Sequence, residues 1–202
     1  MADHPVFAAV YDRAMAGVER GGLRDRRRRL LSRASGRVLE LGAGTGANLA
    51  LYPPAVTSVV ALEPDGAMRR RMLDKLPRAS VPVEVHGEAL PGAFADASFD
   101  TVVMTLVLCT VPDQTETLRE IRRVLRPDGT LLFLEHVRGT GWTSGVQRAA
   151  DPLWRHLAAG CHPSRDTVRA VEAAGFSIDD LERFSMPNAP FLVRPCVAGV
   201  AQ

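Results

Sequence analysis

Three glycines at alternate positions, Gly42, Gly44 and Gly46, constrain this chain more than any other feature. They follow a short apolar run at residues 38–41, which is typical of a buried parallel strand, and residues 47–50 have a helical pattern. A strand, a glycine turn and a helix in this order form the entry to a nucleotide site in a doubly wound α/β fold. Glycine is needed there because the backbone takes positive φ values and approaches a ligand closely.

Two kinds of cofactor can use such a loop. Residues 42–47 fit the dinucleotide pattern G-x-G-x-x-G/A, which is weak evidence when it stands alone. They also fit the Glu-Leu-Gly-x-Gly-x-Gly loop that binds S-adenosylmethionine (SAM). Glu40 favours SAM, because a carboxylate at the strand end suits the cationic amino group of a methionine moiety and disfavours a pyrophosphate. A tight turn without a ligand is the third interpretation.

Length and composition indicate a single globular domain that spans residues 1–202. The net charge of +2 gives no reason to expect a nucleic-acid partner. The first thirty residues lack the hydrophobic region of a signal peptide, and no apolar run approaches membrane-spanning length. We therefore expect a cytoplasmic protein without stable membrane insertion. Cys109, Cys161 and Cys196 are too scattered for a disulfide scaffold or a zinc cluster, so we expect no metal.

Residues 1–35 precede the first strand and are expected to form a helical lid. Apolar residues recur at helical spacing from Phe7 to Val18, and the pair Gly21-Gly22 breaks that helix. A second helix over residues 23–32 carries a basic run at residues 24–29. Such a run can bind anionic lipid or nucleic acid, but it is more often a solvated helix face.

The remainder of the chain alternates between apolar runs and amphipathic segments. This pattern predicts a Rossmann-like, doubly wound and mostly parallel seven-stranded sheet, with helices on both faces and an antiparallel last strand. After the first strand, we expect strands at residues 56–63, 81–86, 99–109, 130–136, 176–184 and 196–201. We expect helices at residues 65–76, 114–125, 146–159 and 165–174.

Glu63 ends the second strand, about twenty residues after the glycine loop. A carboxylate at this position accepts hydrogen bonds from ribose hydroxyls in nucleotide-binding folds. The alternative is a helix N-terminal charge beside Pro64, where an acidic group is also favourable.

Taken together, these residues resemble a class I SAM-dependent methyltransferase. The resemblance depends on residues 40–46, Glu63, residues 87–91, the pair Phe99-Asp100 and residues 125–129. A closer resemblance is to the thiol S-methyltransferase family and its bacterial relatives, and it depends on residues 44–54, 105–111, 135–137, 151–156 and 160–165. The animal members carry a hydrophobic N-terminal anchor that this chain lacks, which leaves the methyl acceptor open.

The resemblance implies a role for each segment around the cofactor. The glycine loop, including Ala43, would present its backbone, and Tyr11 would close over the site, although a plain core tyrosine is nearly as common. Glu88 or its neighbours would contact the adenine, with Met68 packed against it. The residues that we expect at the cofactor are Tyr11, Glu40, Gly42, Ala43, Gly44, Gly46, Glu63, Pro64, Met68, Gly87, Glu88, Ala89, Thr105, Leu106 and Cys109.

Methyl transfer from a sulfonium needs alignment and desolvation, and it needs a base only if the acceptor must lose a proton. His136, at the end of the predicted fifth strand, is the best-placed candidate base, and His156 and His162 are alternatives. A structural role is the more common fate of a lone histidine. The favoured acceptor is a small, apolar thiol. The alternative acceptors are an amine, a phospholipid headgroup, a phenol and a quinone. The alternative functions are those of a small NAD-dependent oxidoreductase and of a SAM-binding module without activity.

Overall fold

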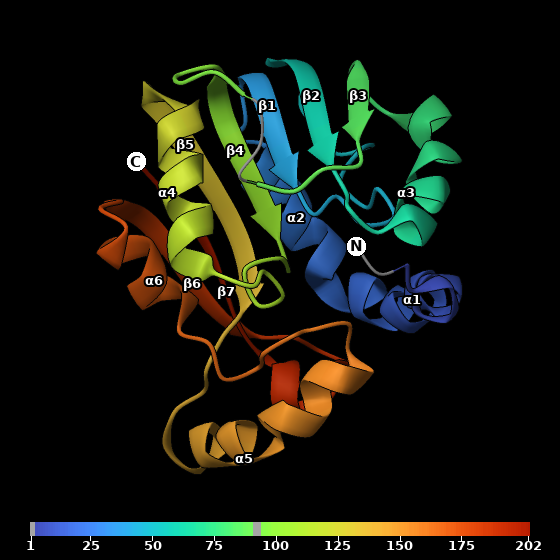
Figure 1. Ribbon diagram of the computed structural model, residues 1–202, viewed down its shortest axis with the longest axis vertical. Coiled ribbons are helices and arrows are strands. Elements are labelled where there is room, and N and C mark those ends of the chain that lie inside the picture. The colour runs from blue at the N-terminus through green and yellow to red at the C-terminus, as the bar shows by residue number, and fades with distance from the viewer. Residues whose placement is uncertain (1–2, 91–93) are drawn as a thin grey trace.

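The computed structural model describes residues 3–90 and 94–202, and their strands form one seven-stranded sheet in the order β3-β2-β1-β4-β5-β7-β6 (Figure 1). Neighbouring strands from β3 to β5 run parallel, whereas β7 is antiparallel to both β5 and β6. This confirms the predicted sheet with its antiparallel last strand. The strands are β1 Gly36–Leu41, β2 Val56–Leu62, β3 Val83–His86, β4 Phe99–Thr105, β5 Leu125–His136, β6 Ile178–Ser185 and β7 Pro195–Ala201.

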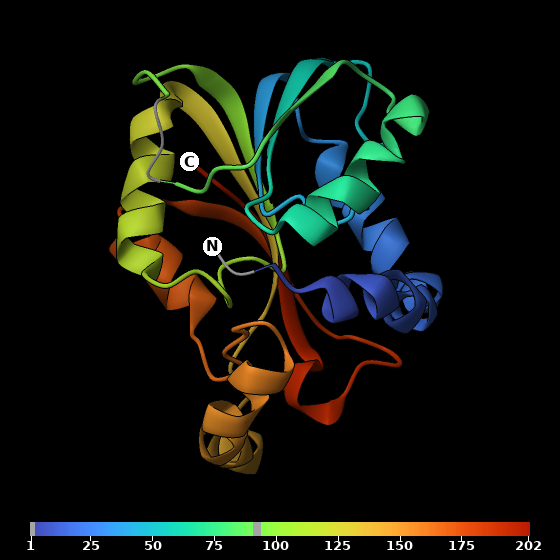
Figure 2. The ribbon, with the colours of Figure 1, turned by 45° about the vertical axis from the view of Figure 1, so that its right-hand side comes forward.

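Helices cover both faces of the sheet (Figure 2). The side chains of β1 alternate between the two faces, so Val38 packs in one buried cluster with α2, and Leu39 packs in the other with α4 and α6. The α-helices are α1 Pro5–Val18, α2 Arg24–Leu31, α3 Gly66–Leu73, α4 Gln114–Val124, α5 Gly141–Leu157 and α6 Thr167–Ala173. Short helical turns lie at Glu19–Leu23, Leu76–Arg78 and Phe191–Val193. Among the helices described, none is long and apolar enough to cross a membrane.

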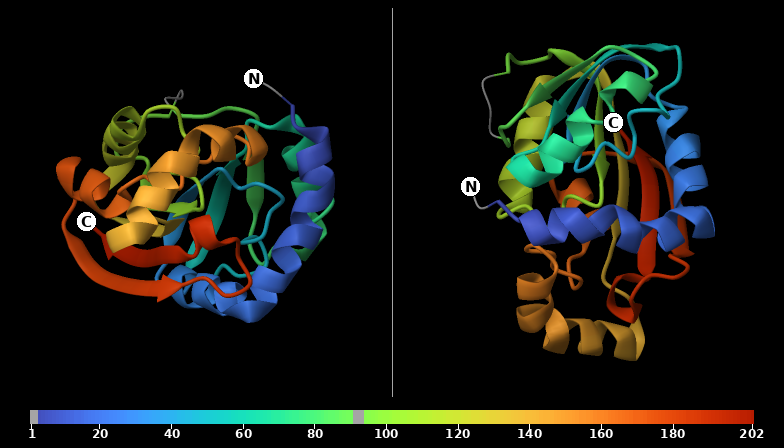
Figure 3. Two further views of the ribbon diagram at one scale, coloured as in Figure 1. Left: turned by 90° about the horizontal axis from the view of Figure 1, so that it is seen from below. Right: turned by 90° about the vertical axis from the view of Figure 1, so that its right-hand side faces the viewer.

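Helix α1 crosses the carboxyl edge of the sheet between α3 and α5 (Figure 3). It continues into α2 through Glu19–Leu23, where Gly22 takes a φ of +113°. Basic residues of α2 form hydrogen bonds and ion pairs with other residues of the protein. Arg27 is buried and bonds to Glu19 and Asn48, while Arg28 pairs with Asp25.

Four segments differ most from the prediction. Residues 47–50 form successive turns and no helix, because the N–H groups of Leu49 and Leu51 donate to carbonyls three residues back, and the pair Pro53-Pro54 follows. The strand expected over residues 99–109 ends at Thr105, where Leu106 takes a φ of +63°.

The other two differences are boundary shifts. β5 begins at Leu125, five residues before its predicted start at Thr130, because Leu125 pairs with Phe99 across an irregular register. α5 begins at Gly141 and not at residue 146. The predicted turn at residues 87–91 is described through Leu90, and Pro91 lies outside the described residues.

Candidate cofactor and acceptor site

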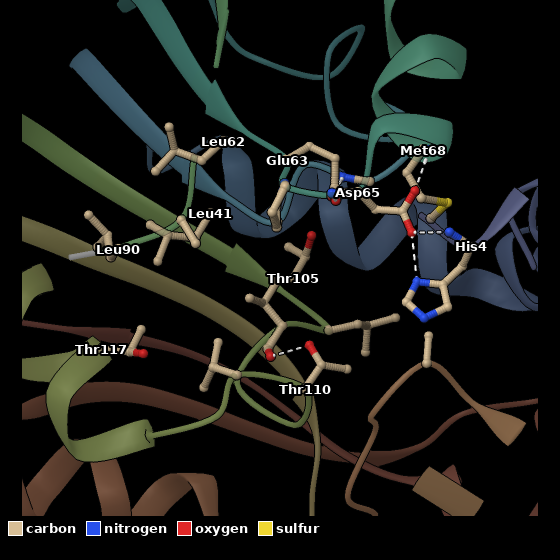
Figure 4. A pocket seen from close by; sticks show the side chains of 18 of the residues that line it. His4, Leu41, Leu62, Glu63, Asp65, Met68, Leu90, Thr105, Thr110 and Thr117 are labelled. Atoms are coloured by element: carbon tan, nitrogen blue, oxygen red, sulfur yellow. Dashed lines mark hydrogen bonds and ion pairs between the residues drawn. The ribbon is translucent and has the colours of Figure 1, made fainter. Parts of the chain in front are cut away.

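A cavity of about 550 Å³ opens at the carboxyl ends of β1, β2 and β4. Glu63, Asp65 and His4 lie at one end of it, and Thr110 and Thr117 lie at the other (Figure 4). From β1 the chain first adds β2 and β3 on one side and then β4 and β5 on the other, so the strand order reverses at β1. Open parallel sheets bind ligands at the carboxyl edge beside such a reversal. The described residues that line it are His4, Phe7, Tyr11, Leu41, Gly42, Gly44, Leu62, Glu63, Pro64, Asp65, Met68, Glu88, Ala89, Leu90, Thr105, Leu106, Val107, Thr110, Val111, Pro112, Thr117, Ala158 and Ala159.

The three glycines of the loop all have positive φ values, but their surroundings differ. A Cβ atom on Gly42 would lie 2.7 Å from a methyl group of Val107, and one on Gly46 would lie 2.8 Å from a methyl group of Leu49. On Gly44, the nearest atom would be Cε of Met68, at 3.7 Å. Gly42 and Gly46 are therefore glycines because the protein packs against them, whereas Gly44 leaves open the space on the cavity side.

Glu63 links the end of β2 to the glycine loop. One carboxylate oxygen accepts from the backbone N–H of Gly44 at 2.7 Å, and the other accepts from that of Asp65 at 2.8 Å. Burial raises the pKa of Glu63, and the two backbone donors oppose that effect. Each oxygen keeps a second lone pair, so the carboxylate can accept further hydrogen bonds from a ligand in the cavity.

Glu40 is not among the described residues that line the cavity. Its side chain is buried, and it accepts from the amide of Asn48 at 2.9 Å and from the hydroxyl of Tyr52 at 2.7 Å. Asn48 also donates to Thr105 at 3.1 Å, at the end of β4. Glu40 therefore joins the turn after the glycine loop to β4 from behind the cavity wall, and its contact with a methionine amino group stays a prediction.

Helix α1 is bonded to the glycine loop and to Lys75 through a polar cluster. Asp12 accepts from the hydroxyl of Thr45 at 2.5 Å and from the ammonium group of Lys75 at 3.0 Å. Hydrogen bonds and the nearby positive charge hold the pKa of Asp12 below its usual range, despite partial burial. This attachment sets Tyr11 and Phe7, whose ring centroids are 5.4 Å apart, against the cavity.

The turn after β4 forms the opposite wall. The carboxylate of Glu135 accepts from the backbone N–H groups of Val107 at 2.8 Å and Leu108 at 3.0 Å. The guanidinium of Arg165 donates to the carbonyls of Leu108 at 2.7 Å and Val111 at 2.6 Å. These bonds hold the turn in place, and sequence reasoning missed both residues because they lie far away along the chain.

The candidate bases do not line the cavity. His136 is buried, with Nε2 3.1 Å from the sulfur of Cys161. The ring of His156 bonds to the carbonyl of Pro152, and that of His162 bonds to Asp151. The catalytic role of His136 stays a prediction, and its imidazole has a protein thiol as its neighbour.

The cavity thus brings together most of the predicted cofactor residues. Tyr11, Gly42, Gly44, Glu63, Pro64, Met68, Glu88, Ala89, Thr105 and Leu106 line it, whereas Glu40, Ala43, Gly46, Gly87 and Cys109 lie outside the lining. Sequence reasoning missed the acceptor end most completely. Val107 and Thr110 belong to the segment 105–111 that carries the family resemblance, but they received no role, and Thr117 and Ala158 belong to no motif. Only the tertiary fold places the four residues together.

Comparison with known proteins agrees with this geometry. The family model described as a methyltransferase domain matches residues 39–133. The chain is 38% identical to the human thiol S-methyltransferase TMT1B over 179 residues, which cover 85% of this chain and 73% of that protein. It is 37% identical to the human thiol S-methyltransferase TMT1A over 171 residues, which cover 81% and 69%. The chain belongs to the thiol S-methyltransferase family.

As a member of this family, the protein is a SAM-dependent methyltransferase. The crystal structure of a SAM-dependent methyltransferase from Thermotoga maritima superposes with a TM-score of 0.70 at 20% identity, covering 98% of this chain and 96% of that one, which supports the fold. The cavity fits SAM, because Gly44 leaves space beside the backbone and Glu63 has free lone pairs next to it.

Proposed function

We propose that this methyltransferase acts on the sulfur atom of a small, apolar thiol. The observation that carries the proposal is the chemistry of the acceptor end of the cavity. Leucine, valine, threonine, proline and alanine line this end, and none of its described lining residues has an ionisable side chain. The residues are Leu106, Val107, Thr110, Val111, Pro112, Thr117, Ala158 and Ala159.

A wall without a base favours the acceptor that loses its proton most readily. Among side-chain groups, the cysteine thiol has an ordinary pKa of about 8.5, whereas the tyrosine phenol and the lysine ammonium titrate near 10. The acceptor sulfur would take the methyl group as a thiolate and release its proton to solvent. The threonine hydroxyls of Thr110 and Thr117 would orient the acceptor, while the apolar wall excludes water.

The cofactor end would hold the nucleoside and the methionine moiety. SAM, when bound, supplies a methyl group on a positively charged sulfur that is already a good leaving group. Glu63 would accept from the ribose hydroxyls, the backbone at Gly44 would approach the cofactor, and Tyr11 would close over it. We also propose that residues 1–202 act as one domain with residues 1–35 as its lid, since α1 supplies two aromatic rings to the cavity.

The test is a panel of acceptors with isotopically labelled SAM, in which methyl addition is detected by mass spectrometry. Aliphatic and aromatic thiols should be methylated, and kcat/KM should rise with the apolar surface of the thiol. Alcohols, amines and phenols of the same carbon skeleton should react far more slowly. Methylation of an amine or a phenol in preference to its matched thiol would refute the proposal.

A pair of variants locates the acceptor. Val111→Asn places an amide in the apolar wall and should lower kcat/KM for apolar thiols by about tenfold, the cost of polar burial of roughly 1–2 kcal/mol. Val146→Asn, on the half-exposed face of α5 outside the lining, should change nothing and serves as the control. Both should bind S-adenosylhomocysteine as the wild-type protein does. Equal loss of activity in the two variants would argue against this placement of the acceptor.

A further inference from the structure

Two cysteines and a histidine form a buried cluster directly behind the acceptor wall. Cys109 lies in the turn after β4, His136 ends β5, and Cys161 follows α5. Their sulfur and imidazole nitrogen atoms all lie within 4.8 Å of one another. Thr110, the next residue after Cys109, and Ala159, two residues before Cys161, both line the cavity. Along the chain, Cys109 and Cys161 therefore lie one and two residues from residues that line the proposed acceptor space.

The surroundings of Cys161 stabilise a thiolate. Its sulfur lies 3.1 Å from Nε2 of His136, and it accepts from the indole N–H of Trp154 at 3.2 Å. The neighbouring Cys109 thiol and the imidazole of His136 hold the pKa of Cys161 well below its usual range, despite burial. The thiol of Cys109 donates to the carbonyl of Leu106 at 3.7 Å, and its pKa is raised by the neighbouring Cys161 and by burial, so the proton of the pair stays on Cys109.

Cys196 provides a contrast within the same chain. It is also buried, but its sulfur donates to the carbonyl of Val193, and burial raises its pKa to about 12. Since the thiolate and not the thiol is the nucleophile, the environments of Cys161 and Cys196 predict very different reactivities.

The spacing of the cluster fits two thiols beside an imidazole better than a tetrahedral zinc site. Zinc–sulfur and zinc–nitrogen bonds of about 2.3 and 2.0–2.1 Å in tetrahedral geometry separate the two ligand atoms by roughly 3.5 Å. The Cys161 sulfur and the His136 nitrogen are closer, at 3.1 Å. A structural zinc site needs one more protein ligand than the three that gather at this point of the described chain, and a three-ligand zinc site with an open position is the alternative that elemental analysis tests.

We propose that Cys161 and Cys109 form a peroxide-reactive dithiol that closes to a disulfide. The thiolate of Cys161 attacks one oxygen of the peroxide, the O–O bond breaks, and the hydroxide leaves as water after taking a proton from His136. The thiol of Cys109 then attacks the resulting sulfenic acid, the S–O bond breaks, and a second water carries away the Cys109 proton. The two thiols lose two electrons, hydrogen peroxide is reduced to two waters, and an external thiol reductant reverses the reaction by exchange.

Closure of this disulfide would act on the acceptor wall. The backbone N–H of His162 already donates to the carbonyl of Cys109 at 2.9 Å, so the two segments are in contact before any bond forms. A sulfur–sulfur bond of about 2.05 Å draws the turn after β4 toward the segment after α5. We expect oxidation to reshape the space at Thr110 and Ala159, and to leave the glycine loop unchanged.

The experiment treats the reduced full-length protein with equimolar hydrogen peroxide, blocks the remaining thiols with an alkylating agent, and maps the peptides by mass spectrometry. The expected product is a disulfide-linked peptide pair containing Cys109 and Cys161, with Cys196 fully alkylated. Cys109→Ser should stop at a sulfenic acid that dimedone traps on Cys161. His136→Gln should slow oxidation by about tenfold or more, since the thiolate loses its partner.

Cys196→Ser is the matched control and should oxidise at the wild-type rate. Circular dichroism of each variant, with Cys161→Ala as a second replacement, separates loss of reactivity from loss of fold. Oxidation of Cys161 no faster than that of Cys196, or a disulfide that includes Cys196, overturns the proposal. Stoichiometric zinc in the purified protein, measured by elemental analysis and lost in Cys161→Ser, also overturns it in favour of a metal site.

Discussion

Replacement of single glycines by alanine can separate the part of the glycine loop that meets the cofactor from the part that only packs. Gly44 and Gly46 have φ values of +59° and +78°, so alanine is strained at both positions. This backbone strain costs roughly 1–2 kcal/mol of stability for an L-residue in the left-handed region. The two variants therefore share one penalty and differ in what the new methyl group meets.

At Gly46 the methyl group would meet the protein core. A Cβ there lies 2.8 Å from Leu49 and 3.1 Å from Met72, and both side chains are buried. Overpacking of this kind adds about 1–3 kcal/mol to the strain. At Gly44 the methyl group would enter the cavity, where the nearest atom, on Met68, is 3.7 Å away. Gly46→Ala should therefore lose more stability, and Gly44→Ala should lose more cofactor affinity.

The assay combines chemical denaturation with calorimetric titration of S-adenosylhomocysteine. Gly44→Ala should lower the free energy of unfolding by about 1–2 kcal/mol and weaken binding at least tenfold, which corresponds to about 1.4 kcal/mol. Gly46→Ala should be less stable by about 2–5 kcal/mol, the sum of both penalties, with binding within a few-fold of wild type wherever it is folded. Wild-type affinity in Gly44→Ala, or a larger affinity loss in Gly46→Ala, would refute the assignment of Gly44 to the cofactor.

Three further changes test other parts of the site. Glu63→Gln turns an amide N–H₂ toward a backbone donor, and calorimetry should show at least about tenfold weaker S-adenosylhomocysteine binding. Asp12→Ala removes the attachment of the lid, so stopped-flow measurements should show faster cofactor release with little change in unfolding free energy. Burial raises the pKa of Glu135 from 4.5 to about 7, so the native state holds a proton that the unfolded state releases. The free energy of unfolding should therefore fall as the pH rises from 4.5 through 7, and denaturation at several pH values should show a smaller fall in Glu135→Gln.

The predicted site residues that the structure brings together at the cavity belong mainly to neighbouring segments of the chain. The glycine loop follows directly from the end of a strand, and Glu63 ends the next strand of the same parallel sheet, so their spacing alone brings them to one edge. The end of β4 was misjudged for a related reason. The apolar run continues to Cys109, but hydrophobicity reports burial and not backbone direction, and the chain turns at Leu106 to reach the carboxylate of Glu135. That partner lies almost thirty residues further along, where no periodicity connects the two.

Glu40 shows the same limit in another form. Its position relative to the glycines fits the family pattern, but a motif does not say which way a side chain turns. The hydroxyl of Tyr52 and the amide of Asn48 draw the carboxylate behind the wall, where burial raises its pKa and the two donors oppose that effect. Glu63, by contrast, lines the cavity and is held there by the backbone donors of Gly44 and Asp65.

The two ends of the cavity are therefore built in different ways, and this bears on how acceptor choice can change. The cofactor end depends on bonds within residues 42–65, which join the glycine loop to the end of β2. The acceptor end depends on the turn after β4, which Glu135 and Arg165 hold from distant segments. A substitution at Val111 or Ala159 alters the acceptor space without touching any bond of the glycine loop. Acceptor specificity can thus diverge among relatives that keep one cofactor site. The cluster of Cys109, His136 and Cys161 lies beside this wall, so its oxidation would change the acceptor end of the cavity and leave the cofactor end unchanged.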